Sequence, residues 1–272
     1  MSRCIFCGGG TSDEHILAQW LIRDCELDSQ PIELGVGADQ GGRFEFITEK
    51  QPLRKFLLTS ICVPCNTGWM SRLENTTKDA LTPFLQLEWP LLDAEPLEAL
   101  VPFCRDLTLW MLKTAVTFGT KMSVPIPQYV IRDLRHGIIY PGVVLDLACS
   151  ELSGTYVAIT KQWNVVVNGN ESVRQNPDGF RLTWQIRHLI LRVSYFPYTA
   201  RLQLKPRYPV VLYPIFNIVP PYESRSGSGI ITYRKRYVYA DVRQFEHETT
   251  YYKTAAPDPV LEGLNRSVAL PW

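Results

Sequence analysis

The pattern of apolar positions changes from helical to strand-like near the middle of the chain. In the first half, Leu73, Leu81 and Leu85 recur near helical spacing, and an apolar stripe predicts a longer helix over about 97–120. A further short helix is predicted over 128–135. In the second half, runs rich in β-branched and aromatic residues predict strands at 143–148, 155–160, 163–168, 180–196, 202–216 and 230–242.

Residues 1–61 follow neither the helical nor the strand period over a long stretch. The apolar run 16–22 is long enough for one or two helical turns, and the glycine-containing segment 28–52 predicts a loop or a weak hairpin with a strand at 43–48. Farther on, Asn168-Gly169-Asn170 predicts a tight turn between strands. Together these patterns predict an α+β fold.

Composition is that of a globular chain. The 272 residues are 46% hydrophobic and 20% charged, so neither disorder nor a disulfide-dependent miniature fold is expected. The net charge of +1 argues against nucleic-acid binding by bulk electrostatics. No apolar run is long enough for a membrane-spanning helix, so we expect no membrane span. An odd cysteine count without a signal peptide predicts a cytoplasmic location.

Two CxxC pairs supply the chain's clearest chemical pattern. Cys4 and Cys7 form the first pair and Cys62 and Cys65 the second, and the long segment 8–61 separates them. Four thiolates are the full ligand set of a structural Zn²⁺ site, and such a closed site cannot activate water. The alternatives are unrelated thiols or a redox CxxC, which normally stands alone at the start of a helix. The other three cysteines, Cys25, Cys104 and Cys149, lie in apolar surroundings and are interpreted as buried thiols.

An acid–histidine pair, Glu14-His15, follows the first CxxC, and Asn66 follows the second directly. The order CxxC, acid–His, CxxC-Asn resembles the HNH (ββα-metal) endonucleases of a zinc-ribbon-supported subtype, and the run 66–70 (NTGWM) with Leu73-Glu74 resembles bacterial HNH-like proteins. The resemblance covers about residues 1–80. It implies a DNA endonuclease that uses Mg²⁺ or Mn²⁺, in keeping with an effector of a bacterial defence system.

The resemblance assigns a role to each of three residues. His15, whose ordinary pKa is near neutrality, would be the base that deprotonates water. Glu14 would bind the catalytic Mg²⁺ or Mn²⁺ through a carboxylate oxygen, and Asn66 would add a neutral oxygen ligand or orient His15. Asn66 is alternatively the N-cap of the following helix.

The sequence also departs from the HNH pattern. Residues 16–61 contain no Asn and no His, so the central Asn is absent. Asn66 replaces the last His, and Met70 stands one turn later. Glu74, two turns past Asn66, is either a distant substitute ligand or a solvated helix residue.

Basic residues lie mainly in the second half. Residues 1–80 hold eight Lys/Arg against eleven Asp/Glu, whereas residues 179–222 hold six Lys/Arg and no acid. We predict that five basic residues contact nucleic acid: Arg187, Arg192, Arg234, Lys235 and Arg236. The run 234–236 lies between two tyrosines, whose rings could stack on bases. The alternative is that alternating arginines form an ordinary solvent-facing side of a sheet. His188 is interpreted as a packed histidine.

We therefore predict an HNH-like zinc-bound nuclease module over 1–86, a helical connector over 87–137, and a mostly-β domain over 138–272. DNA is the expected partner, with RNA as an alternative substrate, and the β domain would recognise nucleic acid, a protein partner or an activating ligand. The alternative function is a catalytically inactive zinc-binding module that binds nucleic acid or protein.

Overall fold

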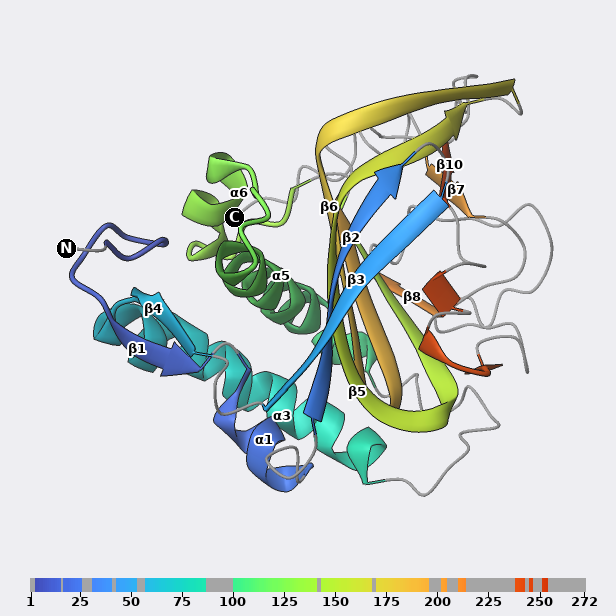
Figure 1. Cartoon of the computed structure of the whole chain (residues 1–272). Helices are drawn as coiled ribbons and strands as arrows, with labels where there is room; N and C mark the ends of the chain where they lie inside the picture. Colours follow the sequence, from blue (N-terminus) through green and yellow to red (C-terminus); the bar gives the residue numbers. More distant parts are fainter. Residues whose placement is uncertain are drawn as a thin grey trace.

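The fold is built on one long antiparallel hairpin, seen in the computed structural model in Figure 1. Its strands are β5 (Val143–Val167) and β6 (Asn170–Tyr195), and Val167 pairs with Asn170 across the predicted Asn168-Gly169 turn. Three separately predicted strands form the single strand β5. The structure describes residues 3–15, 17–25, 31–40, 43–52, 57–86, 100–140, 143–167, 170–195, 202–204, 210–213, 238–242, 245–246 and 251–253.

Successive stretches of β5 pair with different strands along the edge opposite β6. The partners are β2 (Pro31–Gln40), β8 (Val210–Tyr213), β9 (Val238–Tyr239) and β10 (Tyr251–Lys253). Two further strands complete the eight-stranded sheet. Strand β3 (Arg43–Pro52) pairs with β2, and β7 (Leu202–Leu204) pairs with β10.

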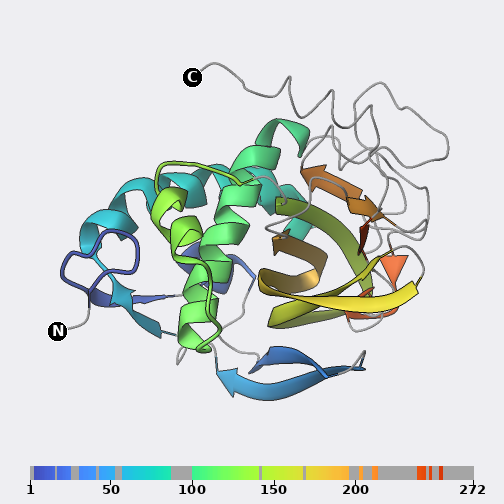
Figure 2. The ribbon, with the colours of Figure 1, turned by 90° about the horizontal axis from the view of Figure 1, so that it is seen from above.

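The β2–β3 hairpin comes from the N-terminal segment but belongs to the large sheet. Residues 33–38 of β2 pair in parallel with residues 156–161 of β5, and the hairpin forms a ribbon at the edge of the sheet (Figure 2). Its strands are ten residues each, longer than the weak hairpin that the sequence predicts. The large sheet therefore contains strands from both sides of residue 86.

Helices cover one side of this sheet (Figure 1). The central helix α5 (Cys104–Lys121) is buried on every side from Leu107 to Gly119, as expected for a helix enclosed by other elements. It packs on the sheet through stacked rings of Trp110 and Trp184, whose centroids are 5.0 Å apart. The predicted helix is confirmed, although it starts at Cys104, after a 3₁₀ turn, η4 (Val101–Phe103), that contains a proline.

The remaining helices lie beside α5. The predicted short helix is α6 (Gln128–Leu134). The helix predicted after the second CxxC comprises α2 (Val63–Cys65), η3 (Asn66–Met70) and α3 (Ser71–Leu85), with a kink inside η3 at Gly68, whose φ of −90° and ψ of −109° are not helical. Near the N-terminus, α1 (Gln19–Asp24) overlaps the second half of the predicted apolar run 16–22. No helix in the described ranges is long and apolar enough to cross a membrane.

The second face of the β5–β6 hairpin is polar as well as apolar. A small apolar cluster there joins Tyr156 and Ile190 to Tyr239, Val242 and Phe245 from the C-terminal part. Between these apolar residues lie the buried Asp146, Arg181, Arg192 and Glu246. This second core contains Arg192, one of the arginines predicted to bind nucleic acid.

Candidate metal centre

A two-stranded antiparallel sheet brings the two CxxC pairs together. Its strands are β1 (Ser12–His15), just after the first pair, and β4 (Leu57–Ile61), just before the second. Ser12 pairs with Ile61, so the start of β1 and the end of β4 meet at one end of the sheet. Strand pairing thereby closes the long separation that the sequence leaves between Cys7 and Cys62.

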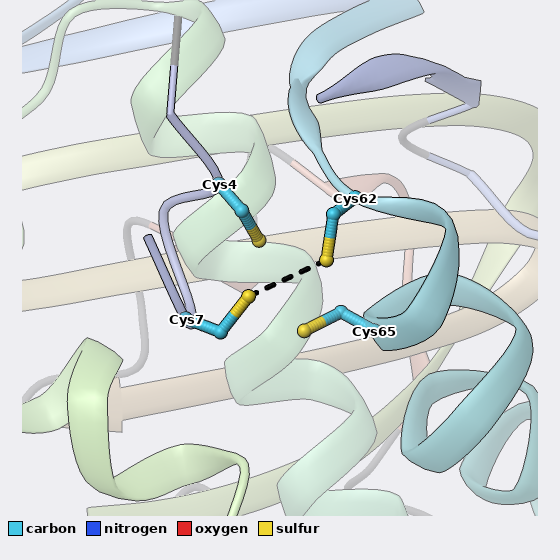
Figure 3. Close-up of side chains that lie close together, drawn as sticks. All are labelled: Cys4, Cys7, Cys62 and Cys65. Carbon is cyan, nitrogen blue, oxygen red and sulfur yellow. Dashed lines mark hydrogen bonds between the residues drawn. The ribbon is translucent and has the colours of Figure 1, made fainter. Parts of the chain in front are cut away.

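The four cysteine sulfurs converge on one point (Figure 3). The Sγ atoms of Cys4, Cys7, Cys62 and Cys65 all lie within 4.8 Å of one another, and those of Cys7 and Cys62 are 3.4 Å apart. A tetrahedral ion with metal–sulfur bonds of about 2.3 Å places its sulfurs about 3.8 Å apart, so these positions fit a structural metal such as zinc. The predicted clustering of the four cysteines is confirmed.

Both CxxC turns have a local structure suited to metal ligation. In the first, the Cys4 N–H donates to the Gly9 carbonyl and the Gly8 N–H to the Cys4 carbonyl, each at 2.8 Å. Gly8 has φ of +76°, a left-handed conformation in which a side chain would be strained. In the second, the Cys65 N–H donates to the Cys62 carbonyl at 3.1 Å as the helix begins.

The electrostatic environment differs among the four thiols. Burial raises the pKa of the Cys4 thiol, but backbone N–H groups, that of Cys62 foremost, outweigh burial and lower the pKa to about 7. Burial raises the pKa of both Cys62 and Cys65, and the neighbouring thiols raise the pKa of Cys65 further. Four thiolates in one place therefore need a cation, and a divalent metal supplies that charge.

Aromatic packing ties the cluster to the helix. Phe6, inside the first CxxC, meets Trp69 of η3 edge to face, with ring centroids 5.2 Å apart. Trp69 follows Cys65 by four residues, so the cysteine cluster and this aromatic pair hold the same two segments together.

The backbone places two of the predicted catalytic residues on β1. Glu14 pairs with Leu58 and His15 with Leu57, and the register shifts between Ser12 and Glu14. Such an irregularity re-aims neighbouring side chains and is common next to active sites. The side chains of Glu14 and His15 lie outside the described part of the structure, so their approach to Asn66 stays a prediction.

Asn66 does not cap the helix that follows it. The helix starts at Val63, with Cys62 at the N-cap, and Asn66 is already helical, with φ of −65° and ψ of −53°. The N-cap interpretation is wrong because the helix begins three residues earlier, at Val63, with Pro64, a residue favoured in a first helical turn, next to it. Asn66 is half-buried on the turn that leaves the metal cluster.

Glu74 is held by a lysine. Its carboxylate accepts from Lys113 Nζ at 2.6 Å, and the Lys113 side chain is almost fully buried. The pair joins α3 to α5. Glu74 is thus held in an ion pair between two helices and is not a freely solvated helix residue.

The described arginines of the predicted basic patch do not form a surface. Arg192 is fully buried and pairs with Asp146, which is the cross-strand partner on β5. Arg187 is half-buried and donates from Nη1 to the Leu85 carbonyl at 3.0 Å, at the end of α3. Both therefore serve the interior. Arg234, Lys235 and Arg236 lie outside the described residues.

His188 is a packed histidine, as predicted. Its Nδ1 lies 2.9 Å from the Ser150 carbonyl oxygen, and the ring is half-buried. Arg181, in the same strand, is buried against Glu246 at 2.8 Å.

Sequence reasoning missed a cleft beside the metal cluster. It lies between α3, the start of α5 and the turn after α6, and its lining includes Trp69, Arg72, Arg105 and Arg135. The helical pattern indicated these helices but not their contact. Gly137, just after α6, is the one local signal, because glycine after a helix indicates a left-handed end.

Comparison with protein-family models, with curated proteins and with solved structures finds no match for this chain. Its function must therefore be inferred from its own residues.

Proposed function

We propose that this chain is a divalent-metal-dependent endonuclease that hydrolyses phosphodiester bonds in DNA and whose N-terminal module is held by a structural Zn²⁺ on Cys4, Cys7, Cys62 and Cys65. The supporting observation is the order of elements around the cluster. An antiparallel pair, β1 and β4, runs into a helix at the four cysteines. Two strands followed by a helix are the elements of the ββα-metal arrangement that the sequence resembles.

In this proposal the chemistry belongs to residues outside the sulfur cluster, because four sulfur ligands leave a metal no open position. His15 accepts the proton of the attacking water, and the water oxygen bonds to phosphorus as the bond to the leaving oxygen breaks. Glu14 and Asn66 offer oxygen ligands to Mg²⁺ or Mn²⁺, which would polarise the phosphate. A proton from solvent neutralises the leaving oxygen.

Plasmid cleavage tests the proposal. We expect the zinc-loaded protein to nick supercoiled DNA when Mg²⁺ or Mn²⁺ is added, and His15→Ala to be at least about 10²-fold slower, the usual contribution of a positioned base. Asp13→Asn, two residues earlier in the same strand, is the matched control and should cleave like the wild type. Zinc content and thermal unfolding of each variant exclude misfolding as the cause.

Two other outcomes have definite meanings. Cleavage of RNA but not of DNA, lost in His15→Ala, would keep the mechanism and change the substrate. Intact DNA and RNA with every variant would refute the enzyme and favour a zinc-binding interaction module. That second candidate is favoured by Glu74, whose carboxylate is committed to Lys113 instead of a catalytic metal.

A further inference from the structure

The cleft beside the metal cluster is a basic recess with an apolar floor. Its volume is about 370 Å³. Buried leucines from three helices, Leu73, Leu109 and Leu134, form the floor. Polar side chains form the walls: Arg72 from α3, Arg105 and Asp106 from α5, and Arg135 and His136 from the turn after α6.

One wall is fixed by the way α6 ends. The Gly137 N–H donates to the Leu134 carbonyl at 2.9 Å, and the Ile138 N–H donates to the Asp133 carbonyl at 3.3 Å, which together form a Schellman motif. Gly137 has φ of +72°, and its carbonyl accepts from Arg105 Nη2 at 2.8 Å. A Cβ on residue 137 would lie 3.2 Å from that nitrogen. Arg105 is therefore held in place before any ligand arrives.

The cleft carries positive charge without matching carboxylates. Three arginines line it against one acid, Asp106. Within the described residues, Arg72, Arg105 and Arg135 form no salt bridge, whereas Arg23, Arg132, Arg181 and Arg192 all do. Arg135 Nε donates to His136 Nε2 at 3.0 Å, which leaves the rest of its guanidinium group for another acceptor. Three arginines from three segments thus line one recess.

We propose that this cleft binds a phosphate group, either in a nucleic-acid backbone or on a free nucleotide. Guanidinium groups match phosphate oxygens with two parallel hydrogen bonds, and three arginines gathered with a single acid, Asp106, favour an anion between them. Half-buried Trp69 also lines the cleft, and an aromatic ring beside a bound phosphate is suited to stacking with a base. Because Trp69 and Arg72 lie in the helical segment that follows the second CxxC, the bound phosphate would lie beside the helix of the proposed nuclease module.

Nucleic acid as the source of the phosphate rests on the proposed function, whereas phosphate binding by the arginines does not. The test is therefore binding without cleavage. Fluorescence anisotropy of a labelled 12-nucleotide DNA strand is measured with zinc-loaded protein and no added Mg²⁺ or Mn²⁺. Unlabelled AMP and inorganic phosphate serve as competitors.

We expect Arg72→Gln and Arg135→Gln each to weaken oligonucleotide binding about tenfold at 0.1 M salt, and the double variant to lower the salt dependence of log Kd by roughly two contacts. Both arginines are exposed, so neither variant should unfold. Lys121→Gln removes the same charge at the other end of α5, about 24 Å from Arg105, and should bind within twofold of the wild type.

The outcomes separate the sources and the two proposals. Arginine-dependent binding that is much tighter for the oligonucleotide than for AMP assigns the cleft to a nucleic-acid backbone, and equal affinities assign it to a free nucleotide. Unchanged binding in Arg72→Gln and Arg135→Gln, or an equal loss in Lys121→Gln, overturns the inference. Retained binding in a protein that cleaves nothing refutes the proposed nuclease but not the phosphate site.

Discussion

Arg192→Met gives the sharpest prediction about the interior. The Arg192 and Asp146 side chains are both 0% exposed, and Asp146 Oδ2 lies 2.7 Å from Arg192 Nη2 and 2.8 Å from Arg192 Nε. The guanidinium group also lies 4.3 Å from the centre of the Phe245 ring. Removing one partner leaves a buried charge uncompensated, which costs about 3–5 kcal/mol. For a chain of this size, that loss lowers Tm by about 10 °C.

Urea and thermal unfolding measure this loss, and two variants control it. Arg132→Met breaks an exposed pair with Asp133, which contributes only about 0–1 kcal/mol. Arg192→Met combined with Asp146→Val removes both charges and should recover most of the stability, since buried ion pairs are often replaceable by apolar residues. A loss below about 1 kcal/mol in Arg192→Met would refute the buried-pair argument. If Arg192→Met weakened nucleic-acid binding without changing stability, the original prediction that Arg192 contacts nucleic acid would hold instead.

Three further predictions concern stability and metal. Cys65→Ala should bind no zinc and lose most of the stability of the N-terminal module, because structural zinc contributes about 10–16 kcal/mol on binding. Cys149→Ala, outside the cluster, should bind zinc like the wild type, and metal analysis and Tm check both variants. Gly119→Ala should lower the free energy of unfolding, measured in urea, by about 1 kcal/mol despite the higher helix propensity of alanine. The reason is that the added Cβ would lie 2.9 Å and 3.1 Å from two isoleucine Cδ1 atoms. A more stable variant would contradict this prediction. Burial raises the pKa of Cys149 to about 12, so the native state keeps a proton that the unfolded state loses above about pH 9. Stability should therefore fall between pH 9 and 12, by up to about 1.4 kcal/mol per pH unit from this thiol alone, and less steeply in Cys149→Ala; equal slopes would contradict the assignment.

The cysteine cluster and the main helices were predictable because their signals are local or chemically specific. Few roles other than metal binding explain two CxxC pairs, and the apolar period over α5 indicates its burial. The Asn168-Gly169 signal likewise predicted the turn of the central hairpin. The helix and turn signals depend on residues close together in the chain, and the two CxxC pairs, although far apart in it, share one chemical role.

The features that the sequence did not reveal depend on partners far along the chain. Counting charges over 179–222 suggested a basic surface, but the acids that neutralise Arg181 and Arg192 are Glu246 and Asp146, which lie outside that window. The pairing of β2 with β5 joins strands from the two halves of the chain. The cleft combines three helices whose contact no periodicity predicts.

We propose a closed metal centre of four sulfurs, with Glu14, His15 and Asn66 outside it as the catalytic residues. X-ray absorption at the zinc edge of the purified protein reports the ligands of that centre. We predict one zinc per chain with four sulfur neighbours at about 2.3 Å. A protein that binds no zinc, or a zinc shell containing nitrogen or oxygen neighbours at about 2.0–2.1 Å, would contradict the account, because a ligand such as His15 would then belong to the metal centre itself.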